Sequence, residues 1–246
     1  MKSLTGKVAI VTGAGRGIGR ALAERLAKDG ASIVVNYAKS AEGAKEVVAA
    51  IEAKGGQALA VQADLSQVVD IRRLFQETIN HFGHLDILVN NSGIGAFTLL
   101  VEVTEEQFDT TFAVNTKGTF FALQEAARHM ADGGRIVSIS TAVTVLSPEG
   151  MTVYAGSKGA IEQFTPIAAK ELGNRGITVN TVSPGAVATE TFKSMAPPDY
   201  QAELTKNTPL GRLGQPEDIA DVVAFLVSEE ARWITGQNIR TTGGLA

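Results

Sequence analysis

The sequence contains no cysteine among its 246 residues, which excludes disulfide bridges and thiolate metal sites. Its three histidines, His81, His84 and His129, lack the spacing of metal ligands, so no metal site is expected. No apolar run approaches the roughly 20 residues of a membrane-spanning helix. The chain also begins without the apolar segment of a signal peptide. These absences predict a cytoplasmic protein that makes no membrane contact.

Clusters of charge of one sign are also missing. The formal net charge is −4, and Lys and Arg are scattered without the basic stripe that binds a nucleic-acid backbone. We therefore expect no nucleic-acid partner. Hydrophobic residues make up 44% of the chain, and a chain of this length can bury a substantial core as one domain. The sequence thus predicts a single domain over residues 1–246.

Short β-rich apolar runs alternate along the chain with helical patterns. Such alternation requires parallel strands joined by right-handed crossovers, and hence an α/β, doubly wound parallel sheet with helices on both faces. The predicted strands are Lys7–Thr12, Ser32–Asn36, Gln57–Val61, Leu85–Val89, Arg135–Ser140 and Ile177–Val182, and the predicted helices are Arg20–Lys28, Ala41–Lys54, Gln67–Phe82, Glu105–Met130 and Val153–Asn174.

Glycines gather between the first predicted strand and the first predicted helix. Backbone N–H groups and the positive end of a helix can there face a diphosphate, and glycine allows the close approach. The spacing is G-x-x-x-G-x-G through Gly13, Gly17 and Gly19, with Ile18 where the G-x-G-x-x-G fingerprint has its last glycine. The loop therefore predicts a dinucleotide site, with a simple tight turn as the alternative.

Tyr154 and Lys158 stand four residues apart in a predicted helix, so their side chains share one face. A neighbouring ammonium stabilises a phenolate and could lower the pKa of a tyrosine from ~10 to roughly 7. The pair therefore predicts acid–base chemistry. A surface or packing role is the alternative.

The order and spacing of four motifs resemble the short-chain dehydrogenase/reductase family over essentially the whole chain. The motifs are Thr12-Gly13-x-x-x-Gly17-x-Gly19, Asn90-Asn91-Ser92-Gly93, Tyr154-x-x-x-Lys158 and Pro184-Gly185. Within the family, the sequence most resembles the branch that is similar to 3-oxoacyl-carrier-protein reductases, which also contains many ketone, aldehyde and sugar reductases. The resemblance implies a Rossmann fold that binds a nicotinamide cofactor and reduces a small-molecule ketone or aldehyde, with Tyr154 as proton donor.

The same resemblance implies a homotetramer. Family members commonly pair long helices, here Glu105–Met130 and Val153–Asn174. Light scattering that showed only a 25.7 kDa particle would reject this expectation.

The residues after the second predicted strand bear on the choice of cofactor. A carboxylate there binds the ribose of NAD, whereas this sequence has Asn36 and Tyr37 followed by Lys39 and Ser40. Together with Arg16, Lys39 offers a cation and Ser40 a hydroxyl to the 2′-phosphate of NADP. We therefore expect NADPH, with NAD less probable. Solvated surface charges are the alternative reading of the two cations.

Further cofactor contacts are implied by the resemblance alone. Asp64 matches the residue that contacts adenine, although Ser66 beside it is an equally good helix N-cap. Asn115 matches a catalytic asparagine that orders water toward the catalytic lysine, with a satisfied buried amide as the alternative. The remaining implied contacts are Leu65, Asn91, Ser92, Gly93, Pro184, Gly185, Val187 and Thr189, besides Tyr154 and Lys158 themselves.

The catalytic serine of the family lies thirteen residues before the tyrosine, and that position holds Thr141. A threonine keeps the hydroxyl that donates to a substrate carbonyl, but its methyl group stiffens χ1. We assign polarisation of the carbonyl to Thr141, with Ser140 as the alternative.

Residues 190–213 are polar, contain prolines and show no clean period, which predicts a substrate lid. A disordered surface insertion is the alternative. Two other functions stay open: an NAD-dependent dehydrogenase of polyols or secondary alcohols, and a catalytically silent dinucleotide-binding module.

Overall fold

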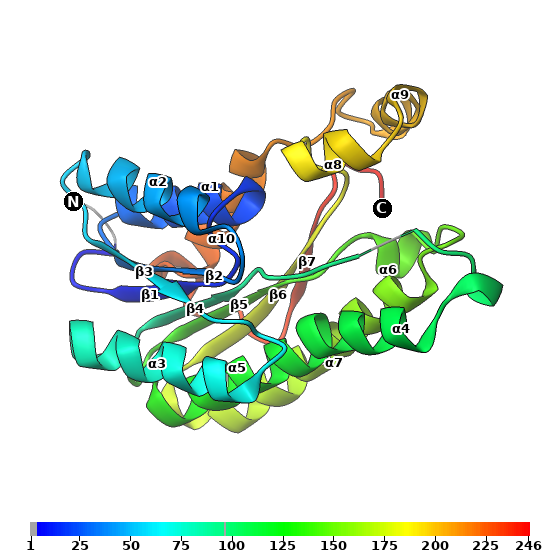
Figure 1. Ribbon diagram of the computed structural model, residues 1–246. Coiled ribbons are helices and arrows are strands. Elements are labelled where there is room, and N and C mark those ends of the chain that lie inside the picture. The colour runs from blue at the N-terminus through cyan, green and yellow to red at the C-terminus, as the bar shows by residue number, and fades with distance from the viewer. Residues whose placement is uncertain (1–3, 96) are drawn as a thin grey trace.

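The computed structural model describes residues 4–95 and 97–246 as a seven-stranded parallel sheet covered by helices (Figure 1). The strand order is β3-β2-β1-β4-β5-β6-β7, so the winding direction reverses between β1 and β4. This confirms the predicted fold class, and such a reversal is where α/β sheets bind ligands. The strands are β1 Val8–Val11, β2 Ser32–Tyr37, β3 Ala58–Gln62, β4 Ile87–Asn90, β5 Arg135–Ile139, β6 Thr178–Pro184 and β7 Asn238–Thr241.

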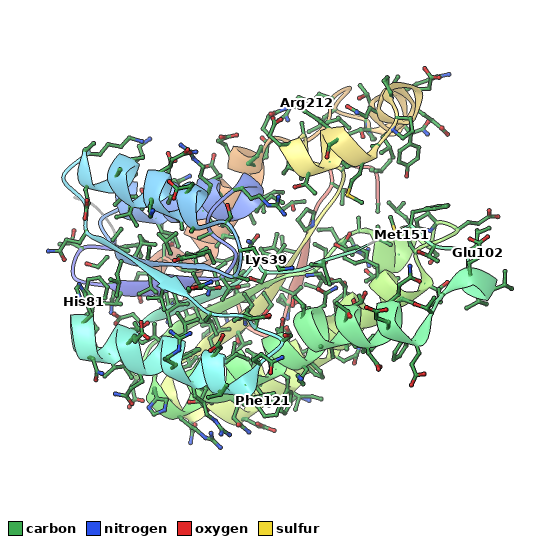
Figure 2. All side chains as sticks on the ribbon, viewed as in Figure 1. Lys39, His81, Glu102, Phe121, Met151 and Arg212 are labelled. Carbon is green, nitrogen blue, oxygen red and sulfur yellow. The ribbon has the colours of Figure 1, made fainter. Side chains whose placement is uncertain are left out.

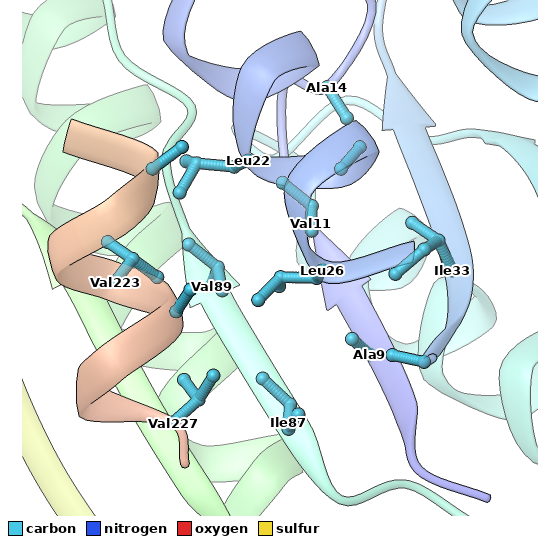
Figure 3. Packing of buried hydrophobic residues seen from close by; sticks show 14 of the residues in the cluster. Ala9, Val11, Ala14, Leu22, Leu26, Ile33, Ile87, Val89, Val223 and Val227 are labelled. Carbon is cyan, nitrogen blue, oxygen red and sulfur yellow. The ribbon is translucent and has the colours of Figure 1, made fainter. Parts of the chain in front are cut away.

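The sheet is buried on both faces because apolar residues occupy consecutive strand positions. In β1, Ala9 and Val11 pack into one cluster with helices α1 (Gly17–Lys28) and α10 (Pro216–Leu226), while Ile10 packs into the other with α3 (Val68–Phe82) and α5 (Gly118–His129). Figure 3 shows the first cluster, where Leu22 and Leu26 lie between β1 and Val223 of α10. Continuous apolar runs of this kind are typical of central parallel strands.

Helices α1, α2 and α10 cover one face of the sheet, and α3, α5 and α7 cover the other (Figure 1). The sequence prediction did not include α10, although Pro216 at its start and a capping box between Gln215 and Asp218 mark its N-terminus. The helices are α1 Gly17–Lys28, α2 Ala41–Glu52, α3 Val68–Phe82, α4 Glu105–Phe112, α5 Gly118–His129, α6 Val143–Leu146, α7 Thr152–Leu172, α8 Glu190–Met195, α9 Pro198–Asn207 and α10 Pro216–Leu226, and the 3-10 turns are Leu100–Glu102, Gly173–Arg175 and Glu229–Ala231.

Two predicted segments differ from the structure. The long helix predicted over Glu105–Met130 is interrupted by one π-helical turn, Ala113–Lys117, between α4 and α5. Residues 190–213 hold two short helices, α8 and α9, which no clean period had indicated. Figure 1 shows them standing apart from the sheet, across from α4 and α6. Their role as a substrate lid stays a prediction.

Within the described residues, none of the helices combines the length and the apolar character needed to span a lipid bilayer.

Candidate active site

The loop between β1 and α1 has the backbone of an anion cradle. Gly13 and Gly17 have φ of 62° and 54°, a region that favours glycine. A Cβ atom on Gly19 would lie 2.2 Å from the carbonyl oxygen of Gly13, so only glycine allows this approach. The first backbone N–H groups of a helix such as α1 have no intrahelical acceptors and point out of its N-terminal end, where an anion can bind. The loop is therefore fit to hold a diphosphate.

The side-chain amides of Asn36, which is buried, and Asn91, which is half-buried, fix this loop to the strand ends. The Asn36 side chain accepts from the Gly13 N–H at 3.2 Å and donates to the carbonyls of Val61 and Ala63. The Asn91 side chain donates to the Thr12 carbonyl at 2.9 Å. The proposed contacts of Asn36 and Asn91 with a cofactor would thus compete with bonds that shape the loop.

The two cations expected to bind a 2′-phosphate are available. Arg16 and Lys39 are exposed, and within the described residues the side chain of neither makes a hydrogen bond or an ion pair; only their backbone carbonyls accept bonds, from Arg20 and Ala41. Lys39 follows the end of β2 (Figure 2), and Ser40 directly precedes α2. Tyr37 packs against the core with part of its ring. Arg16, Lys39 and Ser40 thus remain free to contact a ligand.

Asp64 shapes the turn before α3. Its carboxylate accepts from the Ser66 N–H at 2.9 Å, and its own N–H donates to Asp70. The expected alternative of Ser66 as N-cap is wrong, because Gln67 occupies that position. Leu65 is buried, and a Cβ on Gly118 would lie 2.7 Å from the Leu65 carbonyl oxygen. Leu65 therefore packs between the end of β3 and the start of α5.

Asn115 lies in the π-helical turn and is fully buried. Its amide accepts from the Ile94 N–H at 2.9 Å and donates to the Ile94 carbonyl and to the Ser157 hydroxyl. An asparagine is unfavourable in the interior of an ordinary helix. In the widened π-helical turn, its amide instead joins the loop after β4 to α7. Single π-helical turns are frequent at functional sites.

Tyr154 and Lys158 lie on one face of α7, as predicted. The Lys158 ammonium is buried and donates to the Ile139 carbonyl at 2.8 Å. Gly93 lies beside it, since a Cβ there would be 3.0 Å from Nζ. Lys158 is thereby fixed between the ends of β4 and β5.

The sequence predicted that Lys158 lowers the pKa of Tyr154, and this prediction is wrong for the chain by itself. Burial raises the pKa of Tyr154, and a hydrogen bond with Thr141 offsets part of that rise. Burial also lowers the pKa of Lys158 to about 8. The phenol therefore holds its proton at neutral pH, because desolvation of its charged form outweighs the stabilisation expected from Lys158.

The hydroxyls of Thr141 and Ser140 point to different partners. Thr141 Oγ1 accepts from the Val143 N–H at 3.2 Å and interacts with the Tyr154 phenol. Ser140 Oγ instead donates to the Glu162 carboxylate at 2.6 Å. The geometry thus places Thr141, rather than Ser140, next to the candidate proton donor.

Gly95, which the sequence prediction did not include, lies against the ring of Tyr154. A Cβ on Gly95 would lie 2.7 Å from Cδ2 of the tyrosine. Ser92 is on the other side of the same loop, because a Cβ on Gly13 would lie 2.9 Å from its Oγ. The loop after β4 therefore touches both the glycine cradle and the tyrosine.

We predict that Gly95→Ala displaces the Tyr154 ring and lowers kcat of the expected carbonyl reduction by about 10-fold. The reason is that small misplacements of reacting groups slow a reaction strongly. Gly173→Ala is the matched control, because a Cβ there meets nothing within 4 Å. Steady-state kinetics of both variants test this expectation. A kcat for Gly95→Ala equal to that of the control would contradict it.

The segment after β6 lies opposite the glycine cradle. A Cβ on Gly17 would lie 3.3 Å from Cγ2 of Thr189, and the Thr189 hydroxyl caps α8. The Pro184 carbonyl accepts from the Ala142 N–H, and a Cβ on Gly185 would lie 3.0 Å from Cα of Thr242. Val187 is buried in the core and bridges to Gly214. Thr189 thus lies against the start of α1, whereas Pro184 and Gly185 contact the segments that follow β5 and β7.

Comparison with known proteins agrees with this geometry. A family model described as enoyl-(acyl carrier protein) reductase matches residues 13–246. An uncharacterized oxidoreductase of Methylorubrum extorquens is 51% identical over 247 residues, with 100% of both chains covered. The angucycline C-6 ketoreductase LanV with bound NADP has a TM-score of 0.93 at 44% identity, with 99% of this chain and 96% of that chain covered.

A short chain dehydrogenase of Burkholderia cenocepacia in complex with NADP also has a TM-score of 0.93, at 43% identity, with 99% of both chains covered. Similarity at this level over the whole length shows common ancestry and function class. The chain therefore belongs to the short-chain dehydrogenase/reductase family of oxidoreductases, as its motifs predict.

Proposed function

We propose that this protein is an NADPH-dependent reductase that converts a ketone or aldehyde to an alcohol. The observation that supports this most strongly is the contact between the Tyr154 phenol and the Thr141 hydroxyl, beside the buried Lys158. These groups lie at the ends of β4 and β5, on one side of the switch in strand order, and the glycine cradle follows β1 on the other side. The structures of LanV and of the B. cenocepacia protein contain NADP, which supports the cofactor.

The residues would act as follows. A bound nicotinamide cofactor would supply the hydride. Thr141 donates a hydrogen bond to the carbonyl oxygen, and Tyr154 gives its proton to the same oxygen as negative charge develops there. Because burial keeps the Tyr154 phenol protonated at neutral pH, it is ready to act as an acid. Lys158 and Asn115 hold α7 and the loop after β4 in place around it.

Exposed apolar side chains suggest the kind of carbonyl compound. Phe97, Leu99 and Leu100 lie a few residues after the Asn90–Gly93 motif, and Val145 and Leu146 lie on α6, shortly after Thr141; all five are at least 42% exposed. An apolar rim beside polar catalytic groups is typical of sites for bulky apolar ligands. The angucycline substrate named for LanV is of that kind.

A panel of carbonyl compounds, from small aliphatic ketones to polycyclic aromatic ketones, tests the function by following NADPH absorbance. We expect turnover that favours the bulky members. Binding of NADPH without turnover of any member would favour the silent module, and oxidation of secondary alcohols with NAD would favour the dehydrogenase.

The choice of cofactor is a separate prediction. We expect kcat/KM to be at least about 10-fold higher with NADPH than with NADH, because Arg16 and Lys39 can pair with the 2′-phosphate. Replacing both cations with Ala should reduce this preference and leave kcat/KM with NADH nearly unchanged. Lys28→Ala, at the far end of α1, is the control. A 10-fold preference for NADH would overturn the assignment.

A further inference from the structure

Glu162 is a carboxylate that the proposed chemistry does not use, yet hydroxyl groups from separate elements converge on it. Its Oε1 accepts from Ser140 Oγ at 2.6 Å, and Thr144 Oγ1 lies 2.8 Å from the same oxygen and 2.9 Å from the Thr141 carbonyl oxygen. Ser183 Oγ, on β6, lies 3.4 Å from the same oxygen and 2.7 Å from Asn238 Oδ1. Hydrogen bonds to a charged acceptor are stronger than those between neutral groups.

Two of these hydrogen-bond partners flank Thr141, the residue to which we assign polarisation of the substrate carbonyl. Ser140 directly precedes Thr141, and Thr144 follows it within α6. The Ile139 carbonyl, one residue further back, receives the bond from Lys158. Tyr154, Lys158 and Glu162 are spaced four residues apart on α7, so they form one face of the helix. Each of the three contacts the segment 139–144.

We propose that Glu162 is a positioning residue that holds the Thr141 hydroxyl against Tyr154 through Ser140 and Thr144. Without the carboxylate, the hydroxyl of Ser140, a residue that is only 3% exposed, loses its acceptor. The segment must then shift to find another partner, and Thr141 moves with it. The inference rests on the proposed role of Thr141 in reduction.

The first test compares Glu162→Ala, Glu162→Gln and Glu171→Ala, using the ketone of the panel that turns over fastest. We expect Glu162→Ala to lower kcat by about 10-fold, with KM for NADPH nearly unchanged, because the reacting group is misplaced while the cofactor loop is intact. Glu162→Gln keeps an acceptor oxygen and should recover most of the activity. Glu171, exposed on the same helix, is the matched control and should behave as wild type. Equal losses for Glu162→Gln and Glu162→Ala would overturn the proposal.

The second test separates positioning from general stability. In a Thr141→Ala background, Glu162→Ala should cost little further activity, because residues that act through one another are not additive. If Thr141→Ala by itself keeps full turnover, the assigned role of Thr141 fails. If Thr141→Ala loses turnover and Glu162→Ala adds its full loss to it, only the role of Glu162 fails.

Hydrogen exchange provides a readout that does not depend on activity. Glu162→Ala should speed amide exchange in residues 140–147 and leave residues 7–28 unchanged. Unchanged exchange in 140–147 would overturn the proposal. Should Glu162→Ala fail to fold, Thr144→Val deletes one donor and keeps the carboxylate. It should then give a smaller effect of the same kind in exchange and in kcat, and wild-type behaviour in both would equally reject the proposal.

Discussion

Tyr154→Phe should lower kcat for ketone reduction by about 1000-fold, within the range typical of a lost general acid. The change removes the phenolic hydroxyl and keeps the ring. The ring packs against Gly95, whose Cβ position lies 2.7 Å from Cδ2, and phenylalanine preserves that contact. Fold and cofactor loop should therefore be unaffected, and the loss should appear in kcat.

The measurement is steady-state reduction of the best panel ketone, together with NADPH binding followed by fluorescence. Tyr200→Phe is a suitable control, because Tyr200 lies on α9 and is 44% exposed. Tight binding with lost turnover is the expected result for Tyr154→Phe. Turnover close to wild type would remove Tyr154 from the proposed mechanism.

Thr141→Ala should lower kcat by roughly 100-fold, the effect typical of one lost donor to a developing oxyanion. Thr141 Oγ1 accepts from the Val143 N–H, so its proton is free to be donated toward Tyr154 or a carbonyl oxygen. Thr141→Ser keeps the hydroxyl and should restore most of the rate.

Ser140→Ala discriminates between the two neighbouring hydroxyls. Because Ser140 donates to Glu162, its removal should cost less than that of Thr141 and act through position alone. The opposite order, with Thr141→Ala near wild type and Ser140→Ala reduced about 100-fold, would transfer the polarising role to Ser140. Melting temperatures of both variants control for loss of fold.

Several features of this protein follow from local patterns in its sequence. Apolar runs alternating with helical periods predicted the parallel sheet, because burial on both faces demands continuous apolar strands. The four ordered motifs predicted the family, and the close approach between Gly19 and Gly13 shows why glycine is required in the first of them. The spacing of Tyr154 and Lys158 placed them on one helical face.

The predictions from sequence missed Glu162 and helix α10, although the sequence contains a signal for each of them. Glu162 continues the four-residue spacing of Tyr154 and Lys158, and the Gln215–Asp218 box marks α10. Asn115 was noted as unfavourable in a helix, yet the π-helical turn that accommodates it depends on bonds to Ile94 and Ser157. Those partners are distant in sequence.

By itself, therefore, the sequence determined the fold class, the family and the set of residues that could carry chemistry, since these depend on periodicity and spacing along the chain. Only the tertiary structure decided that Thr141 faces Tyr154 while Ser140 faces Glu162, and that burial raises the pKa of Tyr154. The physical reason is that hydrogen-bond partners and desolvation are set by which faces of β5, β6 and α7 meet. The contacts between these three elements join residues that are far apart in the chain.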